Sequence, residues 1–309
     1  MKILHYLLLG VALCFVACNG DDDKNLSPTG ETNWFALEDS DDELGHLAYE
    51  IYKETGVTIF YNDTIAKVQR GVNPAGEPMY RYEVLGVNYD VTTHYEYLYP
   101  LLTDRDRIKK GMEFLRDEVI PGLLNGVSPC SFLLVDSLIN TNSQVPKNTR
   151  LRDVFKARRT TCVALYEEEE TIDEKSLSVA VLAGEYAAYI FRTTPDKLAV
   201  FYSFSVGKVN NKMDMPLYNQ QLSRLDSKSE WDPDWRTFGF LSYNIDRTYT
   251  KDYRYYCPTQ IQDITDYVKA VLLGDKAFEE ENGEFKRCME KYKVMKSIVA
   301  ELQETLGKR

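Results

Sequence analysis

The sequence predicts an α+β fold with a central buried helix, a small sheet and a helical C-terminal half. Apolar segments follow one another in the order helix, strand, helix, two strands, apolar helix and then mostly helices. Between Val179 and Phe191, thirteen consecutive residues carry a single charge, Glu185. A helix that is apolar around its whole circumference is buried, so this segment is expected to be the central helix. The 309 residues, 44% of them hydrophobic, are enough for one sizeable core.

The folded part is expected to begin with a helix, a strand and a loop or hairpin. Residues 41–55, DDELGHLAYEIYKET, place apolar side chains on one helix face after an acidic first turn. His46 and Glu50 fall on the other face, where a solvated pair is favoured and a metal site is the alternative. Residues 57–63 are predicted as a strand. Residues 72–86 contain proline and glycine and are predicted as a loop or hairpin.

A long helix and two buried strands are predicted next. Thr103 is expected to cap a helix over residues 104–124, which Pro121 should kink or end. Residues 131–137 and 162–166 are short apolar runs, and we expect them to be neighbouring buried strands.

The central helix is expected to start after Asp173, which can cap it, and to end before Pro195. Residues 231–256 are rich in aromatic side chains, for which packing over the core is favoured and a recognition surface is the alternative. Residues 261–272 and 285–306 are predicted as helices, the second with a long apolar seam.

Charge restricts the class of partner. The formal net charge is −11 and the pI is about 5.0, and the Lys and Arg residues occur singly or in pairs. Such a chain lacks the concentrated basic surface of a nucleic-acid binder, so no nucleic-acid partner is expected. The acidic run from Glu167 to Glu170 is interpreted as a solvated turn.

The N-terminus has the pattern of an export signal. Residues 1–17 contain a basic Lys2 and a short apolar run, and the segment FVAC that ends at Cys18 resembles a bacterial lipoprotein box. Cleavage before Cys18 and acylation of its thiol would anchor the chain to a membrane. The acidic residues that follow resemble the export signal of surface lipoproteins of the Bacteroidota type. Residues 18–33 are polar and are interpreted as a flexible tether to a domain over residues 34–309.

Few metal-binding side chains remain after such cleavage. The mature chain would retain His46 and His94 and, besides the acylated cysteine, Cys130, Cys162, Cys257 and Cys288. None of these cysteines has CxxC spacing, so a thiolate zinc site is not expected. Cys130 and Cys162 lie in or beside apolar runs, where small buried thiols are favoured and a disulfide is the alternative.

Two segments resemble the motifs of a known family. Residues 184–188, GEYAA, lie on the apolar helix, and Gln262, Asp263 and Asp266 lie on the helix that follows the loop-rich stretch. This succession is similar to that of the substrate-import-associated zinc metallohydrolase lipoproteins, also described as zinc-binding metallopeptidases. Members of that family carry an HExxH helix of zincin type and a later helix with an acidic, EDFAE-like motif. The resemblance implies a zincin-like single domain.

The zinc-binding motif is degenerate in this chain. In HExxH the two histidines lie one turn apart and bind Zn²⁺, while the glutamate polarises the metal-bound water. Gly184 and Ala188 stand at the histidine positions, and Glu185 retains the general-base position. A buried carboxylate without a metal must be neutralised by protonation, by Arg or Lys, or by hydrogen bonds from Tyr or backbone groups. The alternative is structural, with Gly and Ala marking close helix packing and with Glu185 reaching solvent or pairing with a neighbour such as Arg192 or Arg158.

The resemblance implies a surface-exposed outer-membrane lipoprotein with a catalytically inactive, metallopeptidase-like fold. It also implies partners, namely a TonB-dependent transporter and a substrate-binding lipoprotein of a nutrient-uptake system. No cofactor is expected. An active zinc metallohydrolase with ligands at other positions is the alternative, and the sequence leaves open whether the ligand is a peptide or a glycan.

Overall fold

The computed structural model describes residues 33–87, 97–142, 145, 151–166, 173–210, 212–225, 234–247 and 253–308. Residues 35–309 form one compact unit. The signal segment with Cys18, the tether up to residue 32, the acidic run Glu167–Glu170 and His94 lie outside the described residues. The fold is α+β with small sheets and a helical C-terminal half, as predicted.

A four-stranded mixed sheet forms one side of the core, with strand order β1-β5-β8-β7. Strand β5 (Ser131–Val135) lies between β1 (Thr58–Phe60) and β8 (Thr160–Ala164), and these three strands are parallel. Every residue of β5 and β8 is buried, which explains their continuous apolar sequence. The prediction of two neighbouring buried strands is confirmed. The edge strand β7 (Val154–Lys156), antiparallel to β8, was not predicted.

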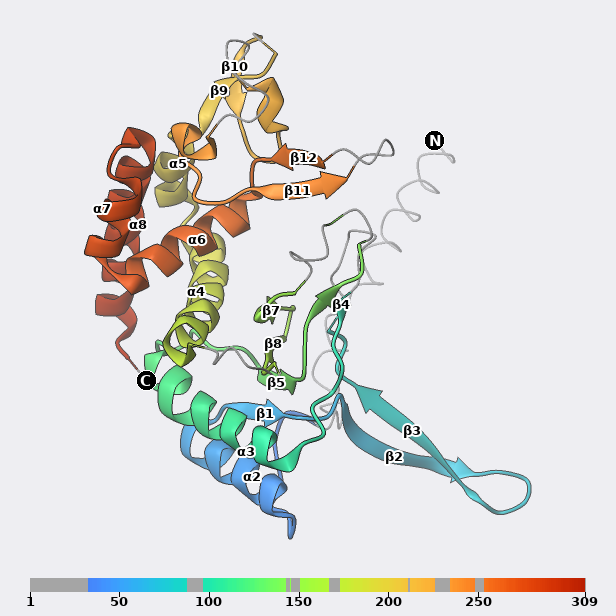
Figure 1. Ribbon diagram of the computed structural model, residues 1–309. Coiled ribbons are helices and arrows are strands. Elements are labelled where there is room, and N and C mark those ends of the chain that lie inside the picture. The colour runs from blue at the N-terminus through green and yellow to red at the C-terminus, as the bar shows by residue number, and fades with distance from the viewer. Residues whose placement is uncertain are drawn as a thin grey trace, which may run out of the picture. The chain divides into compact units, whose positions relative to one another are not determined.

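Helix α4 (Glu174–Thr193) lies between this sheet and the C-terminal helices (Figure 1). It contacts β7 on one side and α6 (Gln260–Leu273) on the other. Half of its residues are buried, and Glu185 is among them. The prediction of a central buried helix is therefore confirmed. Asp173 precedes α4 as expected, but its side chain makes no capping hydrogen bond with the helix backbone.

The N-terminal helices match the predictions in position and differ at their ends. Helix α2 (Glu43–Thr55) buries its apolar face as predicted and packs on β1 and on α3 (Arg105–Phe114). The cap of α3 is Asp104, whose carboxylate accepts a hydrogen bond of 2.9 Å from the Arg107 N–H, so the expectation for Thr103 was wrong. The predicted continuous helix is also wrong beyond Phe114. A π-helical turn and a 3₁₀ turn follow there, and Pro121 has no N–H with which to continue an α-helix.

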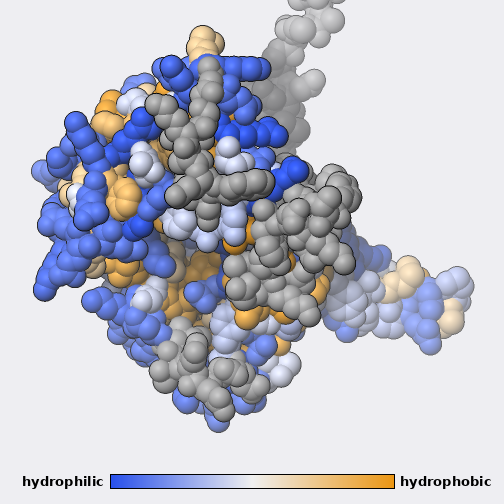
Figure 2. Space-filling view, turned by 45° about the horizontal axis from the view of Figure 1, so that its top comes forward, coloured by the Kyte–Doolittle hydropathy of each residue, from blue (hydrophilic) through white to orange (hydrophobic). Residues whose placement is uncertain are grey.

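A two-stranded hairpin extends away from the sheet (Figures 1 and 2). It consists of β2 (Thr64–Val72) and β3 (Pro78–Val84). The strand predicted for residues 57–63 ends at Phe60, because the side chain of Asn62 accepts a hydrogen bond from the Thr64 N–H and turns the chain into the hairpin. The hairpin alternative for residues 72–86 is confirmed, although its first strand starts earlier than predicted.

Helices α6 and α8 (Lys286–Leu306) confirm the two C-terminal predictions. Two further helices, α5 (Pro195–Ser203) and α7 (Asp275–Asn282), were not predicted. A capping box of Thr259 and Gln262 starts α6. No helix in the described part of the chain is long and apolar enough to span a membrane.

The aromatic-rich region forms a small core of its own. It contains the hairpin of β11 (Asn244–Arg247) and β12 (Tyr253–Tyr256), next to the hairpin of β9 (Val206–Lys208) and β10 (Asp214–Pro216) (Figure 1). Buried and partly buried rings pack here, as the favoured interpretation predicted. These rings belong to Tyr218, Trp235, Phe238, Phe240, Tyr243 and Tyr255. The remaining short pair joins β4 (Tyr97–Leu98) to β6 (Ile139–Asn140).

Candidate functional site

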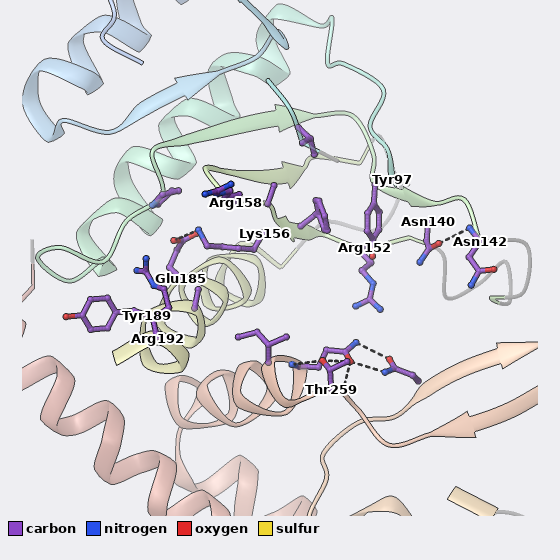
Figure 3. Close-up of a pocket in the computed structure, with 18 of the residues that line it drawn as sticks. Tyr97, Asn140, Asn142, Arg152, Lys156, Arg158, Glu185, Tyr189, Arg192 and Thr259 are labelled. Carbon is purple, nitrogen blue, oxygen red and sulfur yellow. Dashed lines mark hydrogen bonds and ion pairs between the residues drawn. The ribbon is translucent and has the colours of Figure 1, made fainter. Parts of the chain in front are cut away.

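A large pocket of about 1250 Å³ opens between the edge of the mixed sheet and the C-terminal half. Strand β7 and helix α4 line one side, and the start of α6 with the β11–β12 hairpin lines the other (Figure 3). In Figure 2 the described surface is mainly hydrophilic, and apolar side chains reach it in a recess near the middle. This volume is larger than that of most sites that bind one small molecule.

Glu185 lies at the base of this pocket, with only 3% of its side chain exposed. Lys156 Nζ is 2.8 Å from one carboxylate oxygen, and the Thr161 hydroxyl donates a hydrogen bond of 2.6 Å to the other. Lys156 on β7 and Thr161 on β8 are direct cross-strand partners, so the sheet register presents both side chains to the helix. The carboxylate is thus neutralised by a lysine, one of the partners expected from the sequence, and it forms no ion pair with Arg158 or Arg192 among the described residues.

The two positions that resemble the histidines of HExxH have room but no donor atoms. Ala188 lines the pocket, and a Cβ atom placed on Gly184 would meet no atom within 4 Å. The structural alternative, in which Gly184 marks close helix packing, therefore has no support at this residue. Gln262 also lines the pocket, but it exchanges hydrogen bonds of 2.9 and 3.0 Å with Asn244 and accepts one from the Thr259 N–H.

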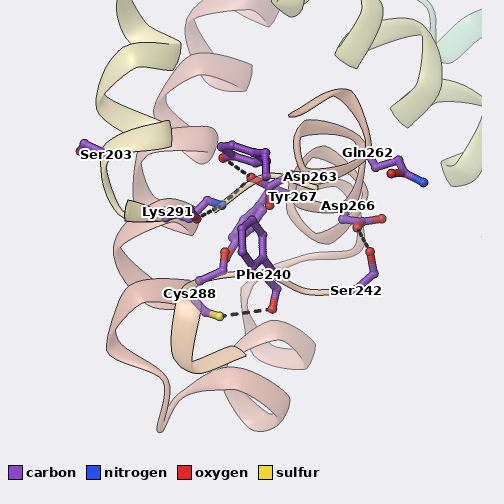
Figure 4. A network of polar contacts seen from close by, with 12 residues as sticks. Ser203, Phe240, Ser242, Gln262, Asp263, Asp266, Tyr267, Cys288 and Lys291 are labelled. Atoms are coloured by element: carbon purple, nitrogen blue, oxygen red, sulfur yellow. Dashed lines mark hydrogen bonds and ion pairs between the residues drawn. The ribbon is translucent and has the colours of Figure 1, made fainter. Parts of the chain in front are cut away.

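Asp263 and Asp266 are not among the residues that line the pocket, and both take part in polar contacts beside it (Figure 4). Asp263 pairs with Lys291, and Asp266 accepts a hydrogen bond from the Ser242 hydroxyl. Within the described residues no group of three or more His, Cys, Asp or Glu side chains is placed to hold a metal ion. The residues present at the resembled motif therefore do not fit a zinc ion.

Asp266 gives a prediction for pH dependence. Burial raises the pKa of this carboxyl to about 6, above its ordinary value of 3.8. The folded protein therefore holds the proton more tightly than the unfolded chain, and this contribution to stability is fully present below pH 3.8 and lost as the pH rises through about 6. Asp266→Asn cannot ionise and should unfold with a free energy up to about 3 kcal/mol higher than wild type at pH 8.

Near pH 4 the two proteins should have nearly equal stability, because the carboxyl is then protonated in the folded wild type. Urea unfolding at pH 4, 6 and 8 measures the difference. A difference that stays constant over this range would show that folding does not raise the pKa of Asp266.

A buried lysine was missed by the sequence analysis. Lys291 on α8 has no exposed side-chain surface, and its Nζ is 2.5 Å from Asp263 and 2.9 Å from the Ser205 hydroxyl. Burial lowers the pKa of Lys291 and raises the pKa of Asp263. A signal was present, because Lys291 lies three residues after Cys288 and four before Met295, on the apolar seam of the helix.

Charged residues around the pocket are mostly basic. Among the described lining residues, four are cationic and Glu185 is the single acid. The cations are Arg152, Lys156, Arg158 and Arg192. The sequence analysis did not identify this group. Its signal is the spacing of residues 152, 156 and 158, which places three cations on one face of an extended segment.

The remaining candidate residues are His46, which lies outside the pocket, and the four described cysteines, which form no disulfide. His46 is exposed, 2.6 Å from Asp39 and 3.4 Å from Glu50, so the solvated pair is the better description. The four described cysteines are free, and the disulfide alternative is wrong. Cys130 is exposed and lines the pocket, whereas burial raises the pKa of Cys162 to about 12.

Comparisons of the chain with protein-family models, with curated proteins and with solved structures gave no match. The resemblance to the zinc metallohydrolase lipoproteins therefore remains an expectation.

Proposed function

We propose that this chain is a non-enzymatic binding protein with a metallopeptidase-like fold, in which the pocket holds a ligand instead of a metal. The observation that carries the proposal is the closed set of contacts around Glu185. Lys156 and Thr161 occupy both carboxylate oxygens, at 2.8 and 2.6 Å. A general base must reach the proton that it removes, and this carboxylate is already committed to two donors.

Within the described residues, the pocket lacks the donor atoms of a zinc site but has the size and shape of a ligand-binding site. The positions that resemble the histidine ligands carry no nitrogen donor, because they are Gly184 and Ala188. The pocket is nevertheless large and open to solvent, and amide, guanidinium and aromatic side chains surround it. Large concave sites with a few convergent polar groups are typical of ligand binding. The combination supports binding without hydrolysis.

The cellular setting is part of the same proposal. The segment that ends at Cys18 supports lipid anchoring in the outer membrane, and the acidic residues after it support exposure at the cell surface. The resemblance supports a role as an accessory component of a TonB-dependent nutrient-uptake system, together with a transporter and a substrate-binding lipoprotein.

Zinc content tests the proposal directly. Protein purified without chelators should hold well below one zinc per chain by elemental analysis, because the described residues that line the pocket offer a single carboxylate, which is already paired. A double variant, Gly184→His with Ala188→His, is the positive control. It places two imidazoles one helical turn apart beside the pocket, where the added side chains have room, and should bind zinc measurably.

Stoichiometric zinc in the wild-type protein would overturn the proposal in favour of an active metallohydrolase. Hydrolysis of a mixed-peptide substrate that is lost on adding a chelator would do the same. If the zinc content stays low while the double variant binds the metal, the assay is shown to be sensitive and the proposal is supported.

A further inference from the structure

We propose that the pocket binds a short acidic oligosaccharide, whose carboxylate or sulfate groups pair with Arg152, Arg158 and Arg192. This inference rests on the proposed function, because it names the ligand class of the same pocket. It goes further in specifying the charge, the length and the chemical type of the ligand.

The charge of the ligand follows from the lining residues. The whole chain has a net charge of −11, yet four cations and one carboxylate line the described part of the pocket, a local net charge of +3. Lys156 is the nearest cation to Glu185 and neutralises it. Three guanidinium groups are then left for a ligand. A cleft lined by one sign of charge concentrates ligands of the opposite sign.

The three arginines are suited to bind anionic groups. All three are exposed, and among the described residues none of them lies within ion-pair distance of an acid, although Asp266 attracts Arg152 from further away. The guanidinium group presents parallel donors that match a carboxylate or a sulfate in two-point contact. In the view of Figure 3, Arg158 and Arg192 lie on the Glu185 side of the pocket and Arg152 lies on the Tyr97 side. A ligand that contacts all three must therefore carry several anionic groups.

Neutral groups that line the same pocket are suited to sugar rings. Asn219 and the amide nitrogen of Asn140 offer polar contacts for hydroxyl groups, whereas the amide of Asn244 is already paired with Gln262. Tyr97 and Phe155 form a ring pair with centroids 4.3 Å apart, and Tyr189 adds another aromatic side chain. Aromatic rings give apolar faces on which the C–H face of a sugar can pack, while the amides satisfy its polar edge.

An acidic peptide fits the pocket less well. An extended peptide gains most of its affinity by adding a strand to an open sheet edge. The edge strand at this pocket, β7, has only three residues, Val154–Lys156. That length gives few main-chain hydrogen bonds, and the side chain of Lys156 already contacts Glu185.

The ligand is also expected to be short. A volume of about 1250 Å³ accommodates several sugar units. The N-terminus of α6 opens on the pocket through Thr259, and its partial positive charge adds to the attraction. Outside the pocket the net negative charge of the chain repels a long polyanion, so an oligomer should bind better than a polymer.

Calorimetric titration of the full chain with four defined probes tests the inference. The probes are a tetrasaccharide of galacturonic acid, a tetrasaccharide of chondroitin sulfate, neutral xylotetraose and a peptide of six glutamates. At least one acidic tetrasaccharide should bind, and xylotetraose should bind at least tenfold more weakly. The two acidic probes distinguish carboxylate from sulfate as the recognised group. Raising NaCl from 50 to 500 mM should weaken binding, because exposed charges are screened.

Variants locate the binding to the pocket. Arg152→Gln, Arg158→Gln and Arg192→Gln should each weaken binding of the acidic tetrasaccharide about tenfold or more, because each removes a charge-assisted contact. Arg70→Gln is the matched control, since Arg70 is exposed on the β2–β3 hairpin and does not line the pocket. It should leave affinity unchanged. Equal melting temperatures would show that the pocket variants are folded.

The inference is overturned if neither acidic tetrasaccharide binds, if xylotetraose binds equally well, or if the glutamate peptide is the preferred probe. It is also overturned if the pocket variants bind like Arg70→Gln. If one of these results is obtained and the protein contains no zinc, only the ligand class is wrong and the proposed function is not contradicted. Stoichiometric zinc would instead overturn the proposed function whatever the probes show.

Discussion

Replacing Lys291 with methionine is expected to lower the free energy of unfolding by about 3 to 5 kcal/mol. Asp263 is fully buried beside Lys291 and would lose its cation, keeping only the Tyr218 hydroxyl at 2.7 Å as a donor. Its second oxygen already has no hydrogen-bond partner within the described residues. Four aromatic rings surround the ammonium group, so water could not readily replace it. They belong to Phe201, Tyr218, Phe240 and Tyr267.

Lys293→Met on the same helix is the matched control. The side chain of Lys293 is 65% exposed and pairs only with Glu290 at the surface, so its loss should change stability by no more than about 0.5 kcal/mol. Urea unfolding near neutral pH compares the three proteins. The deficit of Lys291→Met should shrink at acidic pH, where Asp263 can take up a proton and no longer needs a cation. If Lys291→Met unfolds like Lys293→Met, the buried ion pair does not stabilise the fold.

Replacing Lys156 with methionine is expected to lower the free energy of unfolding by about 2 to 3 kcal/mol. Glu185 would keep the Thr161 hydroxyl but lose its cation while only 3% exposed. The loss should be smaller than for Lys291→Met, because the Lys156 side chain is 27% exposed and water can reach the site. Thermal and urea unfolding near neutral pH measure the effect.

A double-mutant cycle separates this pair from its surroundings. Glu185→Gln should cost no more than about 1 kcal/mol, because an amide still accepts from Thr161 and Lys156 can turn to solvent. The double variant of Lys156→Met and Glu185→Gln should recover most of the stability lost in Lys156→Met, since no charge is then left buried. A Lys156→Met protein as stable as wild type would show that Glu185 does not depend on this cation.

Much of the fold was predictable because the pattern of each segment matched its surroundings. The segments of α2, α6 and α8 have apolar periodicity of the helical kind, the segment of α4 is apolar on all sides, and each helix lies where it was predicted. The buried strands β5 and β8 are continuous apolar runs, as expected for strands covered on both faces. The misses included β7, α5, α7 and the end of the helix predicted over residues 104–124. Short elements show few repeats of a period, and apolar spacing does not mark the change to a π-helical turn after Phe114.

The candidate site was only partly predictable. Glu185 stood out because a charge in an apolar helix requires a partner, and the structure brings Ala188 and Gln262 to the same pocket. Its partner could not be predicted, because Lys156 is 29 residues away in the sequence and reaches Glu185 only through the pairing of β7 with β8. The spacing of residues 152, 156 and 158 was a local signal for the basic lining, but its convergence with Arg192 on one pocket depends on the packing of α4 against β7.

The sequence by itself determined the order of the main elements, the central helix, the isolated carboxylate on it and the absence of histidines at positions 184 and 188. These properties depend on residue type and local spacing, which the sequence contains in full. Only the tertiary structure decided that Lys156 neutralises Glu185, that Lys291 pairs with Asp263 in the core, and that Arg152, Arg158 and Arg192 line one pocket. Each of these depends on distances between segments far apart in the chain, and packing of the whole domain sets those distances.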